Sequence, residues 1–102
     1  MHARVTFLEF QPEDIEASAR LFQEAVSAIH EQEAGFQGAF LLVRDDGAAM
    51  AINFADTLDN LRENDRKGVY QSEVANFRSL IVGHPRREFF RIAASVVPES
   101  EA

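Results

Sequence analysis

The 102-residue chain contains no cysteine and no tryptophan, and it is poor in basic residues. Without cysteine, disulfides, thiolate nucleophiles, Cys-based zinc sites and iron–sulfur ligation are excluded. Because 10 Lys+Arg stand against 17 Asp+Glu, the formal net charge at pH 7 is −7. A negatively charged surface repels phosphate backbones and anionic lipid. We therefore expect neither a nucleic-acid partner nor a membrane partner.

Long hydrophobic runs and targeting signals are also missing. The runs of small and apolar residues, such as residues 48–52, are far too short to span a bilayer. Residues 1–5 lead directly into an alternating pattern and lack the apolar region and cleavage site of a signal peptide. We expect a soluble, cytoplasmic protein.

The sequence lacks metal-binding and phosphate-binding motifs as well. No histidine and carboxylate stand at a metal-ligand spacing such as His-Glu-x-x-His. The glycines follow neither a phosphate-binding spacing nor a Gly-x-Ser-x-Gly turn. We therefore expect no metal and no other cofactor.

The chain has the length of one domain, which we place at residues 1–97, before a polar tail at residues 98–102. A chain of this size buries only about 65% of its unfolded surface, so association with a second copy would add stability. Runs of alternating or continuous apolar residues predict strands at residues 4–10, 36–43, 48–55 and 87–97.

Helical spacing of apolar residues predicts a first helix over residues 12–35. A second, longer helical region begins at a cap on Asp56 or Thr57, and Gly68 interrupts it. The resulting order βαββαβ is the ferredoxin-like arrangement, an α+β fold with both helices on one face of an antiparallel sheet.

The hairpin at residues 45–47 sets which side chains share a face. A two-residue turn predicts that one face meets the helices and that the other carries Asn53 among apolar side chains. The expected helix-facing residues are Ala39, Leu41, Val43, Met50, Ile52 and Phe54. The expected opposite face carries Phe40, Leu42, Ala49, Ala51 and Asn53. Because that face is too apolar to remain in water, we expect a homodimer in which a second sheet covers it.

Three segments give the chain a resemblance to the antibiotic biosynthesis monooxygenase family. They are Val5-Thr6-Phe7-Leu8, Glu33-Ala34-Gly35-Phe36, where the family often has Pro-Gly-Phe, and Ile52-Asn53-Phe54-Ala55-Asp56. The resemblance spans nearly the whole chain and implies a dimeric α/β barrel with a pocket between the helices and the sheet. Members use this pocket to oxygenate aromatic polyketides or quinols without metal or flavin, and others degrade haem.

The chain departs from the family at several positions. Phe54 stands where the family often has tryptophan. The first strand has no asparagine and the second helical region has no histidine, both of which the haem-degrading members have. We therefore expect no haem degradation.

Two residues are candidates for proton transfer. His30 follows the apolar stripe of the first helix, where it could act as a base or relay at the pocket rim, or simply favour the negative end of the helix dipole. Tyr70 is the only tyrosine. It could donate a hydrogen bond to a carbonyl or phenolate in the pocket, or its ring could belong to the core.

Three further residues are candidates for substrate binding. Phe54 and Phe77 could form an aromatic wall for a planar ligand, or they could be ordinary core residues. Arg91 could bind an anionic oxygen, or it could form a salt bridge across the dimer interface. Asn53 could contact a ligand, but the expected register turns it toward the partner sheet.

Three functions are compatible with the sequence. The first is a cofactor-independent monooxygenase acting on a small aromatic or quinone-like molecule. The second is a non-catalytic binding or assembly dimer of the same fold. In the third, side chains fill the pocket and only the interface matters.

Overall fold

The computed structural model describes residues 1–98, apart from the side chains of Val69, Tyr70 and Glu73. Within that part, one antiparallel sheet has the strand order β2-β3-β1-β4. Its strands are β1 (His2–Glu9), β2 (Phe36–Val43), β3 (Ala48–Ala55) and β4 (Arg86–Arg91). This element order and topology confirm the predicted ferredoxin-like fold.

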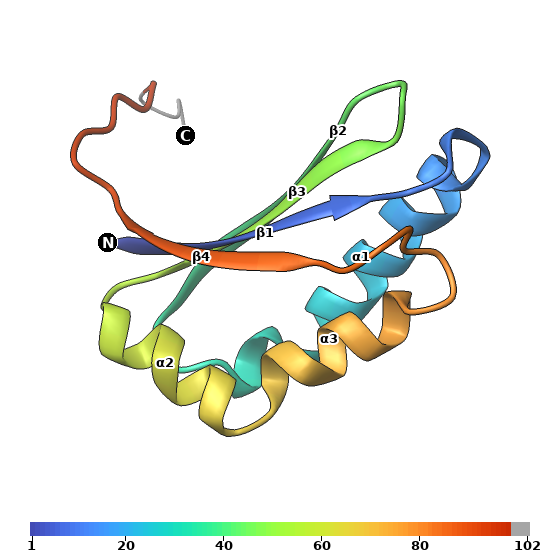
Figure 1. Cartoon of the computed structure of the whole chain (residues 1–102). Coiled ribbons are helices and arrows are strands. Elements are labelled where there is room, and N and C mark those ends of the chain that lie inside the picture. The colour runs from blue at the N-terminus through green and yellow to red at the C-terminus, as the bar shows by residue number, and fades with distance from the viewer. Residues whose placement is uncertain (99–102) are drawn as a thin grey trace.

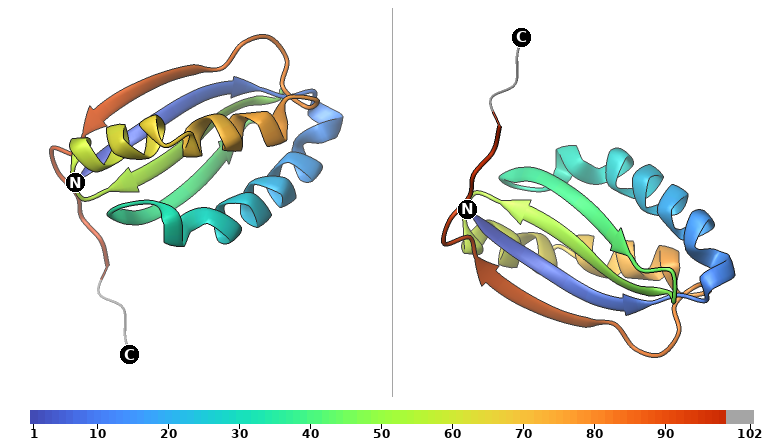
Figure 2. Two further views of the ribbon diagram at one scale, coloured as in Figure 1. Left: turned by 90° about the horizontal axis from the view of Figure 1, so that it is seen from below. Right: turned by 90° about the horizontal axis from the view of Figure 1, so that it is seen from above.

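The helices all lie on one face of the sheet, and residues 1–98 leave the other face uncovered (Figure 1). They are α1 (Ile15–Ile29), α2 (Leu58–Arg66) and α3 (Val69–Phe77), with 3-10 turns η1 (Pro12–Asp14) and η2 (His30–Gln32) flanking α1. Seen from below, α1 runs along the β2 side of the sheet, and α2 and α3 cross beneath the other strands (Figure 2).

Local chemistry explains where the second helical region begins and breaks. The Thr57 hydroxyl accepts a hydrogen bond from the Asn60 amide at 3.1 Å and so caps α2. Gly68 has φ +85°, a left-handed conformation that glycine adopts without steric cost, and it separates α2 from α3. The predicted cap at Thr57 and the predicted break at Gly68 are therefore confirmed.

The hydrophobic core lies between the helices and the sheet. Phe10, Ala49 and Phe77 are its buried centre, and half-buried apolar residues of α1, β1 and β2 pack around them. The Phe77 ring lies 6.2 Å from that of Phe10 and 6.4 Å from that of Phe22, both in tilted geometry. These aromatic contacts join α1 and α3 to the segment that follows β1.

The β2–β3 hairpin has a three-residue turn, so the predicted two-residue register is wrong. The Arg44 amide donates to the Ala48 carbonyl at 2.8 Å, and residues 45–47 form the loop between them. Val43 therefore pairs with Ala49, and paired residues share a face. The extra turn residue reverses the expected faces of β3.

The corrected faces differ strongly in character. Ala39, Leu41, Val43, Ala49, Ala51 and Asn53 share the helix side, and Phe40, Leu42, Met50, Ile52 and Phe54 share the uncovered side. On the uncovered side Phe40 is 61% exposed, Leu42 44% and Phe90 48%. The Phe40 ring meets the Phe54 ring edge-on at 5.9 Å. The predicted apolar outer face is thus confirmed, although Met50, Ile52 and Phe54 of β3 lie on it in place of the predicted Ala49, Ala51 and Asn53.

The last strand is shorter than predicted. β4 ends at Arg91, and the Ile92 amide after it donates to the Met1 carbonyl at 3.0 Å. Residues 92–98 leave the sheet and extend away from the body (Figure 1). Among the described residues, no helix is both long and apolar enough to cross a membrane.

The hairpin turn depends on glycine at position 47. Gly47 has φ +98°, and a Cβ placed there would lie 1.9 Å from the Phe10 carbonyl oxygen, whereas one at Gly68 would have nothing within 4 Å. We expect Gly68→Ala to lower the free energy of unfolding by about 1–2 kcal/mol. Gly47→Ala should cost a further ~1–3 kcal/mol, because the backbone must also move. Urea denaturation of both variants measures this, and equal losses would contradict it.

Candidate functional site

A small cavity lies on the helix side of the sheet, between α1, α3 and strands β1 and β3. Its volume is about 30 Å³. Apolar side chains form most of its wall, and Thr6 and Asn53 are the polar lining residues. Since a water molecule needs roughly 10–15 Å³ of such space, this cavity holds one or two waters and not an aromatic ring.

Asn53, which lines this cavity, carries a buried hydrogen-bond donor without a partner in the described part of the chain. Strand β3 holds it between Arg4 on β1 and Ala39 on β2, and it is only 2% exposed. Its side-chain Nδ2 has no hydrogen-bond partner in the described part of the chain. Burying an unpaired amide costs about 1–3 kcal/mol, so the arrangement favours a ligand or water that supplies an acceptor oxygen.

The sequence prediction that Asn53 faces a partner sheet is therefore wrong. The cause is the three-residue turn, which moves every odd-numbered residue of β3 to the helix side. One sequence signal was present, because Asn53 is the polar residue in an otherwise apolar strand.

A larger, open cleft lies between α1 and the edge strand β2. Its volume is about 570 Å³, which falls within the range of roughly 300–1,000 Å³ usual for ligand sites. Phe36, Phe40 and Leu41 line it from the β2 side, and Gln23 and His30 line it from the α1 side. The cleft therefore has the dimensions that the small cavity lacks.

His30 sits at the C-terminal end of α1, in the wall of the cleft. Its Nδ1 lies 2.9 Å from the Ser27 carbonyl oxygen, and its ring lies 5.7 Å from that of Phe36. Because a carbonyl oxygen only accepts, Nδ1 carries the proton, and Nε2 is left as the nitrogen that can accept one.

The five predicted site residues do not form one cluster. Phe77 lines the small cavity, and His30 lines the cleft. Phe54 lies on the opposite face of the sheet, and Arg91 is exposed at the end of β4 and lines neither hollow. Tyr70 belongs to α3, but its side chain lies outside the described part of the structure.

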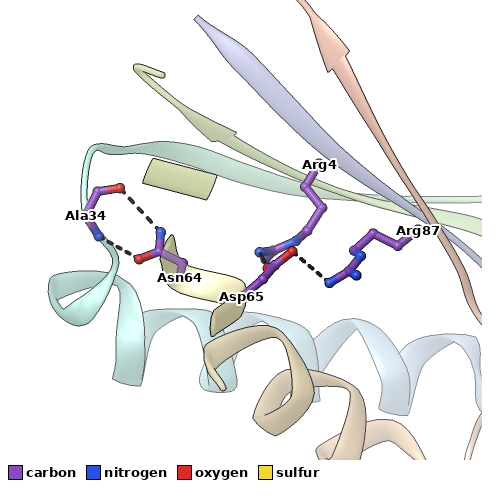
Figure 3. Close-up of polar contacts among 5 residues, drawn as sticks. All are labelled: Arg4, Ala34, Asn64, Asp65 and Arg87. Carbon is purple, nitrogen blue, oxygen red and sulfur yellow. Dashed lines mark hydrogen bonds and ion pairs between the residues drawn. The ribbon is translucent and has the colours of Figure 1, made fainter. Parts of the chain in front are cut away.

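A buried ion cluster fixes α2 against the sheet beside Asn53. The Arg4 guanidinium, 1% exposed, donates to the Asp65 carboxylate at 2.6 Å, and Arg87 of β4 donates to the other oxygen at 2.7 Å (Figure 3). Sequence reasoning missed this cluster, because Arg4 and Asp65 stand 61 positions apart.

Asn64 makes a second attachment next to this cluster. Its Oδ1 accepts from the Ala34 amide at 3.0 Å, and its Nδ2 donates to the Ala34 carbonyl at 3.3 Å (Figure 3). The side chain thus pairs with the backbone as a strand would, and it ties α2 to the loop before β2. Among the described side chains, no three histidines or carboxylates are grouped as metal ligands.

Solved structures with the same arrangement identify the fold. A monooxygenase from the ActVA-Orf6 gene of Streptomyces coelicolor, solved with nanaomycin D, matches with a TM-score of 0.76 at 18% identity, over 96% of this chain and 92% of that one. The chain has the antibiotic biosynthesis monooxygenase fold. A variant of SnoaB, a cofactor-independent oxygenase of Streptomyces nogalater, shares this fold with a TM-score of 0.68 at 19% identity, over 93% of this chain and 95% of that one.

The sequence carries much less of this likeness than the fold does. A protein named antibiotic biosynthesis monooxygenase also superposes over 92% of this chain and all of its own length, with a TM-score of 0.68 at 17% identity. No protein-family model and no curated protein matches the sequence. Identities this low establish the fold, and the activity has to be argued from the site.

The ion cluster makes a stability prediction. Asp65→Asn removes the negative charge between Arg4 and Arg87 while keeping the side-chain shape, and we expect the free energy of unfolding to fall by about 3–5 kcal/mol. Glu63→Gln is the matched control, since Glu63 pairs with Arg66 on the exposed surface of the same helix and the loss of its charge should change little. Chemical denaturation compares the two, and similar effects would contradict the role of the cluster.

Proposed function

We propose that the protein binds a small aromatic or quinone-like molecule on the helix side of the sheet and oxygenates it without metal or flavin. The observation that carries this proposal is the buried, unpaired Asn53 amide at the wall of an apolar cavity. An aromatic ketone or phenolate offers the acceptor oxygen that this donor lacks, and apolar walls suit its ring once neighbouring side chains move to make room for it. The neighbours described as oxygenases lend support through the shared fold.

The chemistry requires only a base, a donor and a dry site. Removal of a proton from the ring CH₂ opposite the carbonyl of an anthrone leaves a carbanion. Its negative charge is delocalised through the flanking aromatic rings onto the carbonyl oxygen. The Asn53 amide stabilises that oxygen. The carbanion's electron pair then forms a C–O bond with dioxygen, and the hydroperoxide loses water to leave a ketone. Dioxygen thus supplies both the new oxygen atom and the oxidising equivalents.

We assign the proton transfer to His30 and Tyr70. Since His30 Nδ1 donates its proton to the Ser27 carbonyl oxygen, Nε2 is the ring nitrogen that accepts the proton from the substrate. Phe77 supplies an aromatic wall of the cavity. Phe54 and Arg91 have no part in this site, because they lie on the opposite sheet face and at the end of β4.

A non-catalytic binding or assembly dimer is the second candidate. The size of the small cavity favours it, because about 30 Å³ next to Asn53 leaves no room for a ring unless neighbouring side chains move. Both candidates use the same donor, so the two differ in turnover and not in where the ligand is held.

Activity should depend on the Asn53 amide. With an anthrone as substrate, we expect Asn53→Ala to reduce the rate of oxygen uptake by about 100-fold, as for removal of an oxyanion donor. Gln71→Ala removes an exposed amide on α3 that lines neither hollow, and it should leave the rate within about twofold. Circular dichroism verifies that both variants are folded.

The outcomes separate the two candidates. Oxygen uptake that is equal in the wild type and Asn53→Ala would sink the proposed role of the amide. Tight binding of the anthrone by the wild type without oxygen uptake would favour the non-catalytic dimer.

We further propose that a second copy of the chain covers the open sheet face. Phe40, Leu42 and Phe90 are each more than 40% exposed there, and the half-buried Met50, Ile52 and Phe54 adjoin the first two. A contiguous apolar surface of this kind marks a protein interface. A like sheet also matches it in shape, since sheets pack face to face at about 10 Å.

A charge placed on this face should prevent dimerisation. We expect Leu42→Glu to convert the dimer into a monomer, because a carboxylate would be buried in the apolar interface without a partner. Ala28→Glu is the control, because Ala28 is exposed on α1, on the helix side of the sheet. Native mass spectrometry reports both masses, and a wild-type monomer would contradict the interface.

A further inference from the structure

The two hollows on the helix side are each incomplete as a ligand site. The cavity is lined by Asn53 but has a volume of only about 30 Å³. The cleft has a volume of about 570 Å³, but Asn53 does not line it. A ring-sized ligand that uses Asn53 must therefore occupy space from both. What separates the two hollows decides whether it can do so.

Two side chains of α1 line both hollows, and they are Phe22 and Val26. They are four residues apart, so they lie one above the other on the same helix face. Val26 is β-branched and is held in a single preferred χ1 rotamer in a helix. Phe22 is larger, and a helical phenylalanine has two accessible χ1 rotamers, near 180° and −60°. Of these two side chains, Phe22 is therefore the one that can change its rotamer.

The contacts of Phe22 fit a movable side chain. It is half-buried, and its ring lies 6.4 Å from that of Phe77 at an interplanar angle of 44°. Phe77 is 6% exposed and belongs to the centre of the core, so it stays in place while Phe22 can leave toward the cleft. A planar ligand could then take the position of the Phe22 ring against Phe77 and keep an aromatic contact there.

We infer that Phe22 is the gate between the open cleft and the Asn53 cavity, and that it limits the size of ligand that reaches the amide. This inference rests on the proposed function in so far as Asn53 is the anchor of the ligand. The ligand enters from the α1–β2 cleft, displaces the Phe22 ring and places its acceptor oxygen on Asn53 Nδ2. The apparent association constant is the intrinsic constant multiplied by the fraction of molecules in which the gate is open.

Removing the gate should tighten and speed binding. Minor conformers of this kind are populated at about 0.1–10%, so Phe22→Ala should raise the association constant for 1,4-naphthoquinone by about 10- to 1,000-fold, chiefly through the association rate. Leu21→Ala is the matched control, since Leu21 packs on the same core from the same helix but lines neither hollow. The absence of cysteine keeps the quinone from alkylating thiols.

Stopped-flow titration of the three proteins provides the measurement, with Phe22→Leu as a milder variant should Phe22→Ala unfold. A rise in association rate for the Phe22 variants but not for Leu21→Ala supports the gate. Association rates equal to that of the wild type in both Phe22 variants would overturn it.

Two further measurements separate the gate from the proposed function. In the crystal structure of Phe22→Ala, we expect one hollow continuous from His30 to Asn53, whether or not any quinone binds. Two hollows still divided in that structure would refute the gate. If Phe22→Ala binds faster but adding Asn53→Ala changes nothing, the gate stands and the proposed anchor fails.

Discussion

The pairing of Val43 with Ala49 across the β2–β3 turn is the constraint on which both faces of the sheet depend. Three residues close the turn, and Gly47 fits there because glycine tolerates its φ of +98° and has no Cβ to meet the Phe10 carbonyl oxygen. This register places Asn53 with the helices and Phe54 with the uncovered side. A shift by one residue would exchange them, so one short turn determines the site and the apolar face together.

The ion cluster extends this constraint to the helices. Arg4 is the cross-strand neighbour of Asn53, and its guanidinium, almost fully buried, holds Asp65 of α2. A buried charge without its partner is costly, so α2 has little freedom to slide over the sheet. α3 follows α2 directly after Gly68, and the position of Phe77 in the cavity wall is therefore tied to the same anchor.

Local signals made most of the fold predictable from the sequence. The βαββαβ order of the elements along the chain, the cap on Thr57 and the break at Gly68 each depend on a few adjacent residues. The face of Asn53 was not predictable, because Asp45-Asp46-Gly47 is compatible with a two-residue or a three-residue loop and only the backbone hydrogen bonds decide between them. Arg4 and Asp65 were missed because nothing local signals a pair so distant in sequence.

The two faces of β3 differ in the size of their side chains. Its odd-numbered residues are small apart from Asn53, which leaves space for a hollow above the strand. Met50, Ile52 and Phe54 on the other face are large and apolar, which suits a surface that another sheet covers. The core otherwise packs closely around Phe10 and Phe77, and a lone buried amide donor contributes nothing to such packing. A polar residue that interrupts an apolar strand without stabilising the fold points to ligand binding, and the proposed function therefore rests on Asn53.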